Sequence, residues 1–207
     1  MDRRDRHCPL KKNKMKQDFI LRDFLPQDLK KAEEIALKLW GNEGDFIPPF
    51  HLEKVYRFRV RYYYSADSSF NCAVTDENGN LCGFLLAHTR GAGKNTDSPE
   101  NDALEHIQTY KAYLDGNKKA EEYFLRKDEV ILLLFASIQK GCGSLLMKEF
   151  ERRCRRTGIR SILLWTDDTC NFEWYQKNGF SELCRFPAVP SLPGRLLYTF
   201  IFRKELD

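Results

Sequence analysis

The stretch that decides the fold is Asp128–Cys154, which reads DEVILLLFAS-IQKGCGS-LLMKEFERRC. Within it, Val130–Phe135 is an unbroken apolar run of strand length, and this predicts a strand buried on both faces. A helix is predicted directly afterwards, because apolar residues recur at helical spacing among charged ones: Leu146, Phe150 and Cys154. Gly158 then stands where a helix-terminating glycine is expected.

Two glycines, Gly141 and Gly143, lie at the junction of this strand and helix. Glycine lets the backbone turn sharply and lets a ligand approach without meeting a Cβ atom. The unpaired N–H groups and the dipole of a helix N-terminus favour an anion at such a place. The junction therefore predicts a phosphate site, and a tight turn without a ligand is the alternative interpretation.

The next segments extend the pattern. Arg160–Thr166 (RSILLWT) predicts another strand, and Asp167–Phe180 (DDTCNFEWYQKNGF) follows it. Taken together, the glycine-containing loop at 139–143 and the later Asn171, Tyr175 and 177–180 (KNGF) resemble the Gcn5-related N-acetyltransferases, or GNAT family. The resemblance covers roughly the last 80 residues on these motifs and the earlier part of the chain by element order alone.

The resemblance implies that acetyl-CoA is the co-substrate. It implies that the end of one strand and one asparagine contact the pantetheine arm of acetyl-CoA, and that the glycine loop binds its pyrophosphate. The residues implied to bind it are Phe135, Ala136, Ser137, Gln139, Lys140, Gly141, Cys142, Gly143, Ser144 and Asn171. Helix capping is the alternative role for Asn171. The side chain of Cys142 has two interpretations, a structural cysteine packed in the core and a thiolate nucleophile, and no histidine that could act as its base is close in sequence.

Acetyl transfer to an amine needs a base for the amine and an acid for the departing thiolate. The resemblance implies that Tyr175 is the acid, with packing of its ring in the core as the alternative. It implies that Glu129, at the start of the central strand, is the base. Other carboxylates remain open for that role: Asp128, Asp67 and Glu173.

The loop departs from the family pattern because it runs Gln-x-Gly-x-Gly, one residue short, with a short lead from Phe135 to Gln139. About three residues fewer than usual therefore separate strand and helix. Three explanations stay open: fewer amides hold the pyrophosphate, acetyl-CoA binds in another position, or the chain given lacks residues.

Composition limits the other function classes. The chain has 207 residues and a net charge of +4, but residues 1–16 alone carry seven basic and two acidic side chains, so the remainder is close to neutral at −1. A globally basic nucleic-acid-binding domain is not indicated.

Seven scattered cysteines without a C-x-x-C pair favour a reducing cytoplasm. No apolar run approaches the roughly 20 residues of a membrane-spanning helix.

We expect a disordered basic extension at 1–17 and one domain at 18–207. The fold class predicted by the element order and the resemblance is α/β (α+β), with a mixed, mainly antiparallel sheet flanked by helices. A helical insertion is expected at about 91–127, as two helices separated at Asp115-Gly116. The other expected elements are a strand at Asp18–Phe24, a helix at Pro26–Leu39, a helix (or strand) at His51–Tyr64, a hairpin of Ser69–Thr75 and Leu81–Thr89, a short helix at Asn171–Lys177, and strands at Phe180–Phe186 and Arg195–Arg203.

The function that follows is an acetyl-CoA-dependent N-acetyltransferase acting on a primary amine, with an acceptor pocket formed by 46–66 and 91–127. An antibiotic, a polyamine, an amino acid and a protein N-terminus all stay open as acceptors, and so does a homodimer. The alternative is a catalytically inactive GNAT-like domain that binds a partner such as RNA through the basic extension and Arg152–Arg156. No metal site is expected, since no ligand cluster has suitable spacing.

Overall fold

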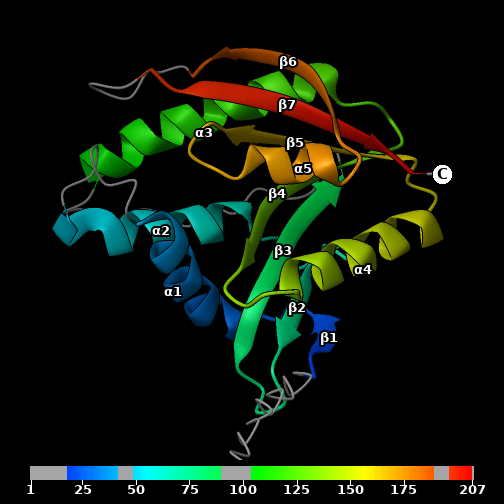
Figure 1. The fold of residues 1–207 in the computed structure, drawn as a ribbon. Coiled ribbons are helices and arrows are strands. Elements are labelled where there is room, and N and C mark those ends of the chain that lie inside the picture. Colours follow the sequence, from blue (N-terminus) through cyan, green and yellow to red (C-terminus); the bar gives the residue numbers. More distant parts are fainter. Residues whose placement is uncertain (1–17, 42–48, 90–103, 189–195, 207) are drawn as a thin grey trace, which may run out of the picture.

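The computed structural model describes residues 18–41, 49–89, 104–188 and 196–206. These residues form seven strands, five α-helices and one 3-10 turn (Figure 1). In chain order the elements are β1 (Ile20–Asp23), η1 (Pro26–Asp28), α1 (Leu29–Trp40), α2 (Pro49–Tyr63), β2 (Cys72–Thr75), β3 (Leu81–Thr89), α3 (Leu104–Phe124), β4 (Glu129–Ser137), α4 (Cys142–Arg156), β5 (Ser161–Asp167), α5 (Phe172–Lys177), β6 (Ser181–Pro187) and β7 (Tyr198–Glu205).

The seven strands form a single sheet in the order β1-β2-β3-β4-β5-β7-β6. Every neighbouring pair is antiparallel except β4 and β5, which run parallel. Their ladder joins Glu129–Leu132 to Ser161–Leu164 and then stops. Beyond it, β4 continues against β3 alone and β5 continues against β7 alone. The sheet is therefore open between its two central strands over the second half of their length.

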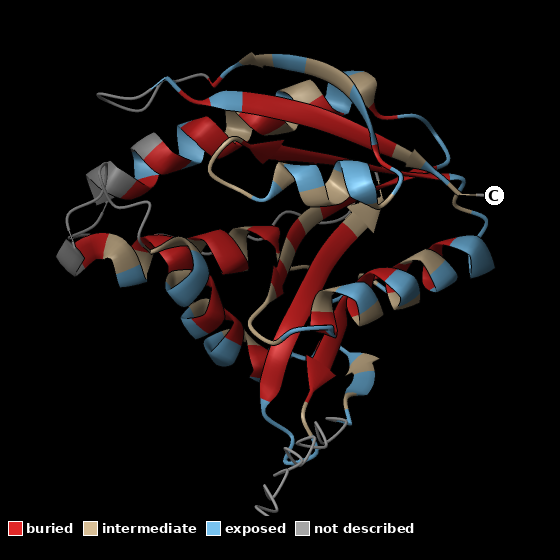
Figure 2. Ribbon diagram, in the orientation of Figure 1, coloured by how far each residue is buried: buried red, intermediate tan, exposed pale blue. Residues whose placement is uncertain are grey.

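Helices cover both faces of the sheet (Figures 1 and 2). On one face α1, α2 and α3 pack over alternate strand residues such as Phe84 and Leu86. On the other face α4 packs over the residues between them, such as Leu85, and the aromatic side chains of α5 join the same cluster. The central strands are buried on both sides, as the apolar run of β4 predicts.

The helix predicted after that run is confirmed in α4. Leu146, Phe150 and Cys154 are all fully buried, so the apolar face deduced from their spacing is the one that meets the sheet. Gly158 follows the helix with a φ of 77°, the left-handed conformation that favours glycine after a helix end. This stretch of sequence forms a strand, a short turn and a helix, as expected.

The predicted break at Asp115-Gly116 is wrong, because α3 runs without interruption through both residues. Its inner face carries Tyr113, Asn117 and Glu121 at four-residue spacing, and all three are buried. Burial of this face stabilises the helix more than one interior glycine destabilises it, at about 1 kcal/mol. The first part of the expected helical insertion, residues 91–103, lies outside the described residues, as does the basic extension at 1–17.

The other predicted elements are confirmed within a few residues of their ends. The segment at 51–64 is a helix, α2, and it begins at Pro49, where proline is tolerated because a first-turn N–H has no helical partner. The hairpin of β2 and β3 turns at Gly79, with a φ of 81°. No helix in the described part of the chain is long and apolar enough to cross a membrane.

Candidate active site

A cavity of about 810 Å³ lies where β4 and β5 separate. Its walls come from both diverging strands, from the first turn of α4, from α5 and the turn before it, and from α1 and α2. The lining residues are Leu39, Trp40, Arg59, Leu133, Leu134, Phe135, Ser137, Gly143, Trp165, Thr166, Asp168, Thr169, Cys170, Asn171, Trp174 and Tyr175. The cavity thus joins the predicted phosphate site to the helices on the opposite face of the sheet.

The glycine turn has the geometry of an anion site. Gly141 precedes α4 with a φ of 96°, so a side chain here would be strained. The first helical hydrogen bond runs from the Leu145 N–H to the Gly141 carbonyl, which leaves the N–H groups of Gly143 and Ser144 without a partner inside the helix. A Cβ atom at Gly143 would lie only 3.3 Å from Phe135 Cζ and from Ser137 Oγ.

Cys142, the first residue of α4, is fully buried. Burial raises the pKa of its thiol to about 11, the opposite of what a thiolate nucleophile requires. Its side chain packs in the core beneath the turn, together with Leu146 and Met147. Only its backbone is placed to take part in the turn.

The last residues of β4 expose main-chain groups to the cavity. Phe135, Ala136 and Ser137 pair with β3 on one side, and the parallel ladder with β5 has already ended on the other. Phe135 and Ser137 line the cavity, whereas Ala136 is buried against the other face of the sheet. An extended ligand could therefore pair with the free edge of β4, as a strand would.

On the opposite wall, α5 contributes the asparagine and the tyrosine of the sequence motif. Asn171 lines the cavity at the N-cap of α5, but its side chain makes no capping hydrogen bond. Tyr175 also lines the cavity, and its ring packs against Phe135 and Phe180 with centroid separations of 6.4 and 5.5 Å. Burial raises the pKa of the Tyr175 hydroxyl, so it stays protonated at neutral pH.

The structure thus brings together Phe135, Ser137, Gly143, Asn171 and Tyr175 around one cavity. Gln139, Lys140, Gly141 and Ser144 lie in the turn and first helical turn beside it, with Lys140 exposed. The Oε1 atom of Gln139 is enclosed and has no hydrogen-bond partner among the described residues.

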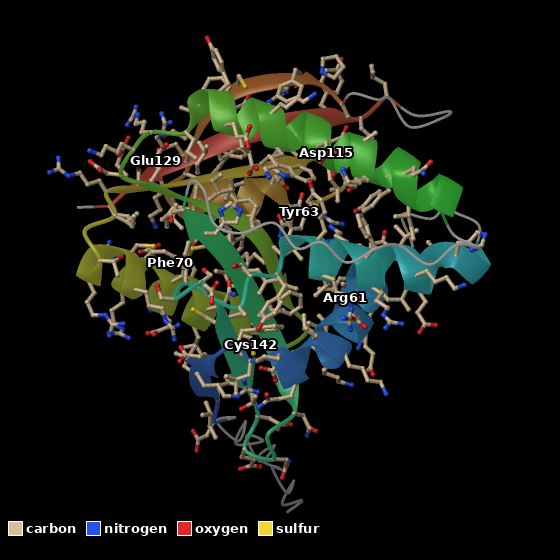
Figure 3. All side chains as sticks on the ribbon, turned by 180° about the vertical axis from the view of Figure 1, so that it is seen from behind. Arg61, Tyr63, Phe70, Asp115, Glu129 and Cys142 are labelled. Atoms are coloured by element: carbon tan, nitrogen blue, oxygen red, sulfur yellow. The ribbon has the colours of Figure 1, made fainter. Side chains whose placement is uncertain are left out.

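Glu129 does not belong to this site, which corrects the sequence-based interpretation. It lies at the start of β4, where β4 and β5 are still paired, and Figure 3 shows it far from Cys142. Its side chain is fully buried in an ion pair with Arg203, and the Ser161 hydroxyl donates a hydrogen bond of 2.8 Å to its Oε1. A carboxylate held in this way ties strands together and is not open to an acceptor amine.

The other three carboxylates considered for the base do not line the cavity either. Asp128 precedes Glu129 at the same closed end of β4, and Asp67 is exposed in the turn before β2. Glu173 is exposed on α5 and pairs with Lys177. Their positions leave the role of base to another residue.

Asp168 is the cavity carboxylate that the sequence reasoning missed. It follows β5 directly, and its Oδ1 is enclosed without a hydrogen-bond partner in the described structure. Its neighbour Asp167 does not line the cavity and accepts a hydrogen bond of 2.9 Å from the Tyr113 hydroxyl. Two acidic residues directly after a buried strand were a signal for polar groups at its carboxyl end.

Arg59 was also missed. It is only 6% exposed, yet it lines the cavity from α2. Its guanidinium lies over the Trp40 ring, 4.4 Å from the centroid, and 5.9 Å from the centroid of Tyr110. Stacking on aromatic rings is a favourable setting for a guanidinium with little contact with water. From sequence alone it was one of several arginines on a helix of uncertain type.

Among the described residues, no group of three or more His, Cys, Asp or Glu side chains is arranged to hold a metal ion. The chemistry available from the described cavity residues includes that of a carboxylate, a tyrosine hydroxyl, backbone amides and a guanidinium.

The position of Glu129 gives a direct test of its role. We expect Glu129→Gln to lower the free energy of unfolding by about 3 kcal/mol, because it leaves the buried Arg203 cation without its partner charge. Urea denaturation measures this. The exposed Glu173→Gln is the control and should change stability by less than about 0.5 kcal/mol. Unchanged stability in Glu129→Gln, with loss of turnover, would return Glu129 to the mechanism.

Comparison with known proteins places the fold. The sequence matches no protein-family model and no curated protein. Among solved structures, the C-terminal condensation domain of Ebony in complex with β-alanyl-dopamine aligns over 91% of this chain and 99% of its own, with 11% identity and a TM-score of 0.65. A GCN5-related N-acetyltransferase from Kribbella flavida aligns over 91% and 98%, with 12% identity and a TM-score of 0.58.

The PaiA N-acetyltransferase from Thermoplasma acidophilum, solved in complex with coenzyme A, aligns over 91% of this chain and 99% of its own, with 16% identity and a TM-score of 0.55. At these identities the likeness concerns the fold, and it covers nearly the whole length of each chain. Together with the sheet that opens between β4 and β5, it shows that this chain has the fold of the Gcn5-related N-acetyltransferases.

Proposed function

We propose that this protein transfers the acetyl group of acetyl-CoA to a primary amine. The observation that carries the proposal is the cavity between β4 and β5, because a helix N-terminus, a carboxylate and a guanidinium all line it. Support comes from the shared fold, and from a structural neighbour that was solved with coenzyme A. The cavity volume is within the range of small-molecule sites.

The pyrophosphate of acetyl-CoA would lie at the N-terminus of α4. The free N–H groups of Gly143 and Ser144 would donate to its oxygens, and the helix dipole adds a favourable field. The left-handed Gly141 lets the chain enter the helix in a short loop. With one residue fewer than the family pattern, this turn offers fewer amides, and exposed Lys140 is placed beside it as a cation.

The pantetheine arm would extend along the free edge of β4. Main-chain groups of Phe135–Ser137 would pair with its amides, and the Asn171 side chain would contact it from the opposite wall. This arrangement satisfies polar main-chain groups that the open sheet leaves without a strand partner. It directs the thioester toward Asp168 and Arg59.

Asp168 would then accept the proton that the acceptor ammonium must lose before its nitrogen can attack. The nitrogen forms a bond to the thioester carbon, and a backbone N–H at the edge of β4 stabilises the resulting oxyanion. As the carbon–sulfur bond breaks, Tyr175 donates its proton to the thiolate, and the nitrogen loses its second proton. The products are an N-acetyl amide and coenzyme A, with one proton released to solvent.

The alternative of a non-catalytic nucleic-acid-binding domain receives little support from α4. Arg152 and Arg153 both pair with Glu149, and Arg155 lies 3.5 Å from Glu151. Arg153 is also nearly buried and donates hydrogen bonds to the carbonyls of Ser69 and Asn71. Most of this basic run is engaged within the domain, which makes it a poor phosphate-binding face.

The proposed pyrophosphate site predicts the effect of a charge at Gly143. Gly143→Glu should abolish acetyl-CoA binding in calorimetry, because a carboxylate would occupy and repel the phosphate position. Lys148→Glu, which introduces the same charge at an exposed position of the same helix, should bind acetyl-CoA within about threefold of the wild type. Equal affinity of wild type and Gly143→Glu would place the phosphates elsewhere.

Asp168 as base predicts that Asp168→Asn keeps acetyl-CoA affinity and lowers kcat by about 10²–10⁴-fold, the usual contribution of a positioned base. Raising the pH should partly restore the rate of this variant, because more of the amine is then neutral without help. Steady-state kinetics between pH 7 and 9.5 measure both effects. A variant with wild-type kcat at pH 7 would exclude Asp168 as the base.

Tyr175 as acid predicts that Tyr175→Phe lowers kcat by about 10²–10⁴-fold with little change in acetyl-CoA affinity, since one hydroxyl is removed and the ring packing remains. The raised pKa of Tyr175 also predicts no loss of wild-type rate from this group up to its ordinary pKa near 10, because the acid form persists above that pH. Tyr198→Phe, at an exposed position at the start of β7, is the control. Wild-type kcat in Tyr175→Phe would make water the proton source.

A further inference from the structure

The acceptor end of the cavity contains two buried hydrogen-bond donors that the proposed chemistry does not use. One is the Arg59 guanidinium, which is 6% exposed. The other is the indole N–H of Trp165, a residue that is 8% exposed. Both residues line the same cavity. Neither group can accept a hydrogen bond, so a ligand that meets them must supply acceptor atoms.

The Trp165 indole nitrogen is enclosed and has no hydrogen-bond partner among the described residues. A buried donor without a partner costs about 1–3 kcal/mol, so such a group calls for a ligand or a water. Because the ring lines the cavity, a molecule bound there can satisfy this N–H group. This observation points to a ligand independently of Arg59.

The two donors are connected by a row of packed aromatic rings. Arg59 lies 5.9 Å from the ring centroid of Tyr110, whose centroid is 6.1 Å from that of Tyr113. Tyr113 in turn meets Trp165 edge to face at 5.6 Å. The aromatic rings hold the guanidinium and the indole in fixed positions and keep water away, which strengthens their attraction for an anion.

We propose that the acceptor is a free amino acid, or a similar small amino carboxylate, whose carboxylate is bound by Arg59 and the Trp165 indole N–H. The proposal rests on the proposed acetyl transfer and specifies its substrate class. Asp168, with its enclosed and unpartnered Oδ1, would hold the amine of the same molecule. A guanidinium matches the two oxygens of a carboxylate, and the acceptor must be small because the thioester arm shares the cavity.

Matched acceptors test this in the wild-type enzyme. Each of the twenty amino acids, β-alanine and 4-aminobutyrate is compared with its amide and with its decarboxylated amine, and coenzyme A release gives kcat/KM. For at least one of these amino acids, kcat/KM should be about 10- to 100-fold higher for the acid than for its amide. This is the usual contribution of hydrogen bonds to a charged group. The intrinsic reactivity of the amine would favour the amide over the acid. The amino group of an amino acid amide is less basic than that of the free acid, so more of it is neutral at pH 7.5.

Single substitutions test which residues cause the preference for the acid over its amide. Arg59→Met should reduce the ratio of acid to amide toward one, and Arg59→Lys should leave it in between. Trp165→Phe, which removes the N–H donor together with part of the indole ring, should lower it several-fold. Arg57→Met is the matched control, because Arg57 lies two residues away on α2, is half-exposed and is near Glu33 outside the cavity. This control should keep the wild-type ratio.

The failures of the two proposals are distinguishable. Titration of the best acid and its amide into the full-length protein, with and without coenzyme A, measures their binding to the anion site in the absence of turnover. Acid-selective binding that Arg59→Met removes, in a protein that does not bind acetyl-CoA, would support the anion site and overturn acetyl transfer. Intact acetyl-CoA binding with equal use of acids and amides would overturn the amino acid proposal, as would an unchanged ratio in a folded Arg59→Met variant.

Discussion

The organising constraint of this structure is the short parallel ladder between β4 and β5. Four residues of each strand pair, and then the strands separate. Main-chain polar groups beyond that point still need partners, because buried N–H and C=O groups are rarely left without one. The parting strands therefore create both a cavity and a set of directed hydrogen-bonding groups along its wall. Every feature of the candidate site is arranged around this opening.

The closed end of the same two strands is held by charge. Glu129 on β4, Ser161 on β5 and Arg203 on β7 form one buried cluster, and the Arg203 guanidinium also donates to the Phe124 carbonyl at the end of α3. Removing either charge would leave the other buried and unpaired, which is far more costly than losing an exposed ion pair. The sheet is thus fixed at one end of the strand pair and free to receive a ligand at the other.

The cavity collects charged and polar groups from several elements. The N-terminus of α4 offers free N–H groups and the positive end of a helix dipole. Asp168, after β5, and Arg59, on α2, add opposite charges to the lining, and Arg59 lies over the Trp40 ring. The Tyr175 hydroxyl on α5 has a pKa raised by burial and keeps its proton. These groups suit a ligand with an anionic part and a neutral reactive centre, together with a second, charged molecule.

The sequence by itself determined the elements whose patterns are local. The apolar run of β4, the spacing in α4 and the glycines at 79, 141 and 158 act within a few residues, so they predicted strand, turn and helix, and the motif on α5 placed Asn171 and Tyr175. The tertiary structure alone decided that α3 continues through Gly116, that Glu129 pairs with Arg203, and that Trp40, Arg59, Trp165 and Asp168 share one cavity. These residues lie far apart in the chain, and their meeting depends on strand order, register and helix packing, which no local pattern encodes.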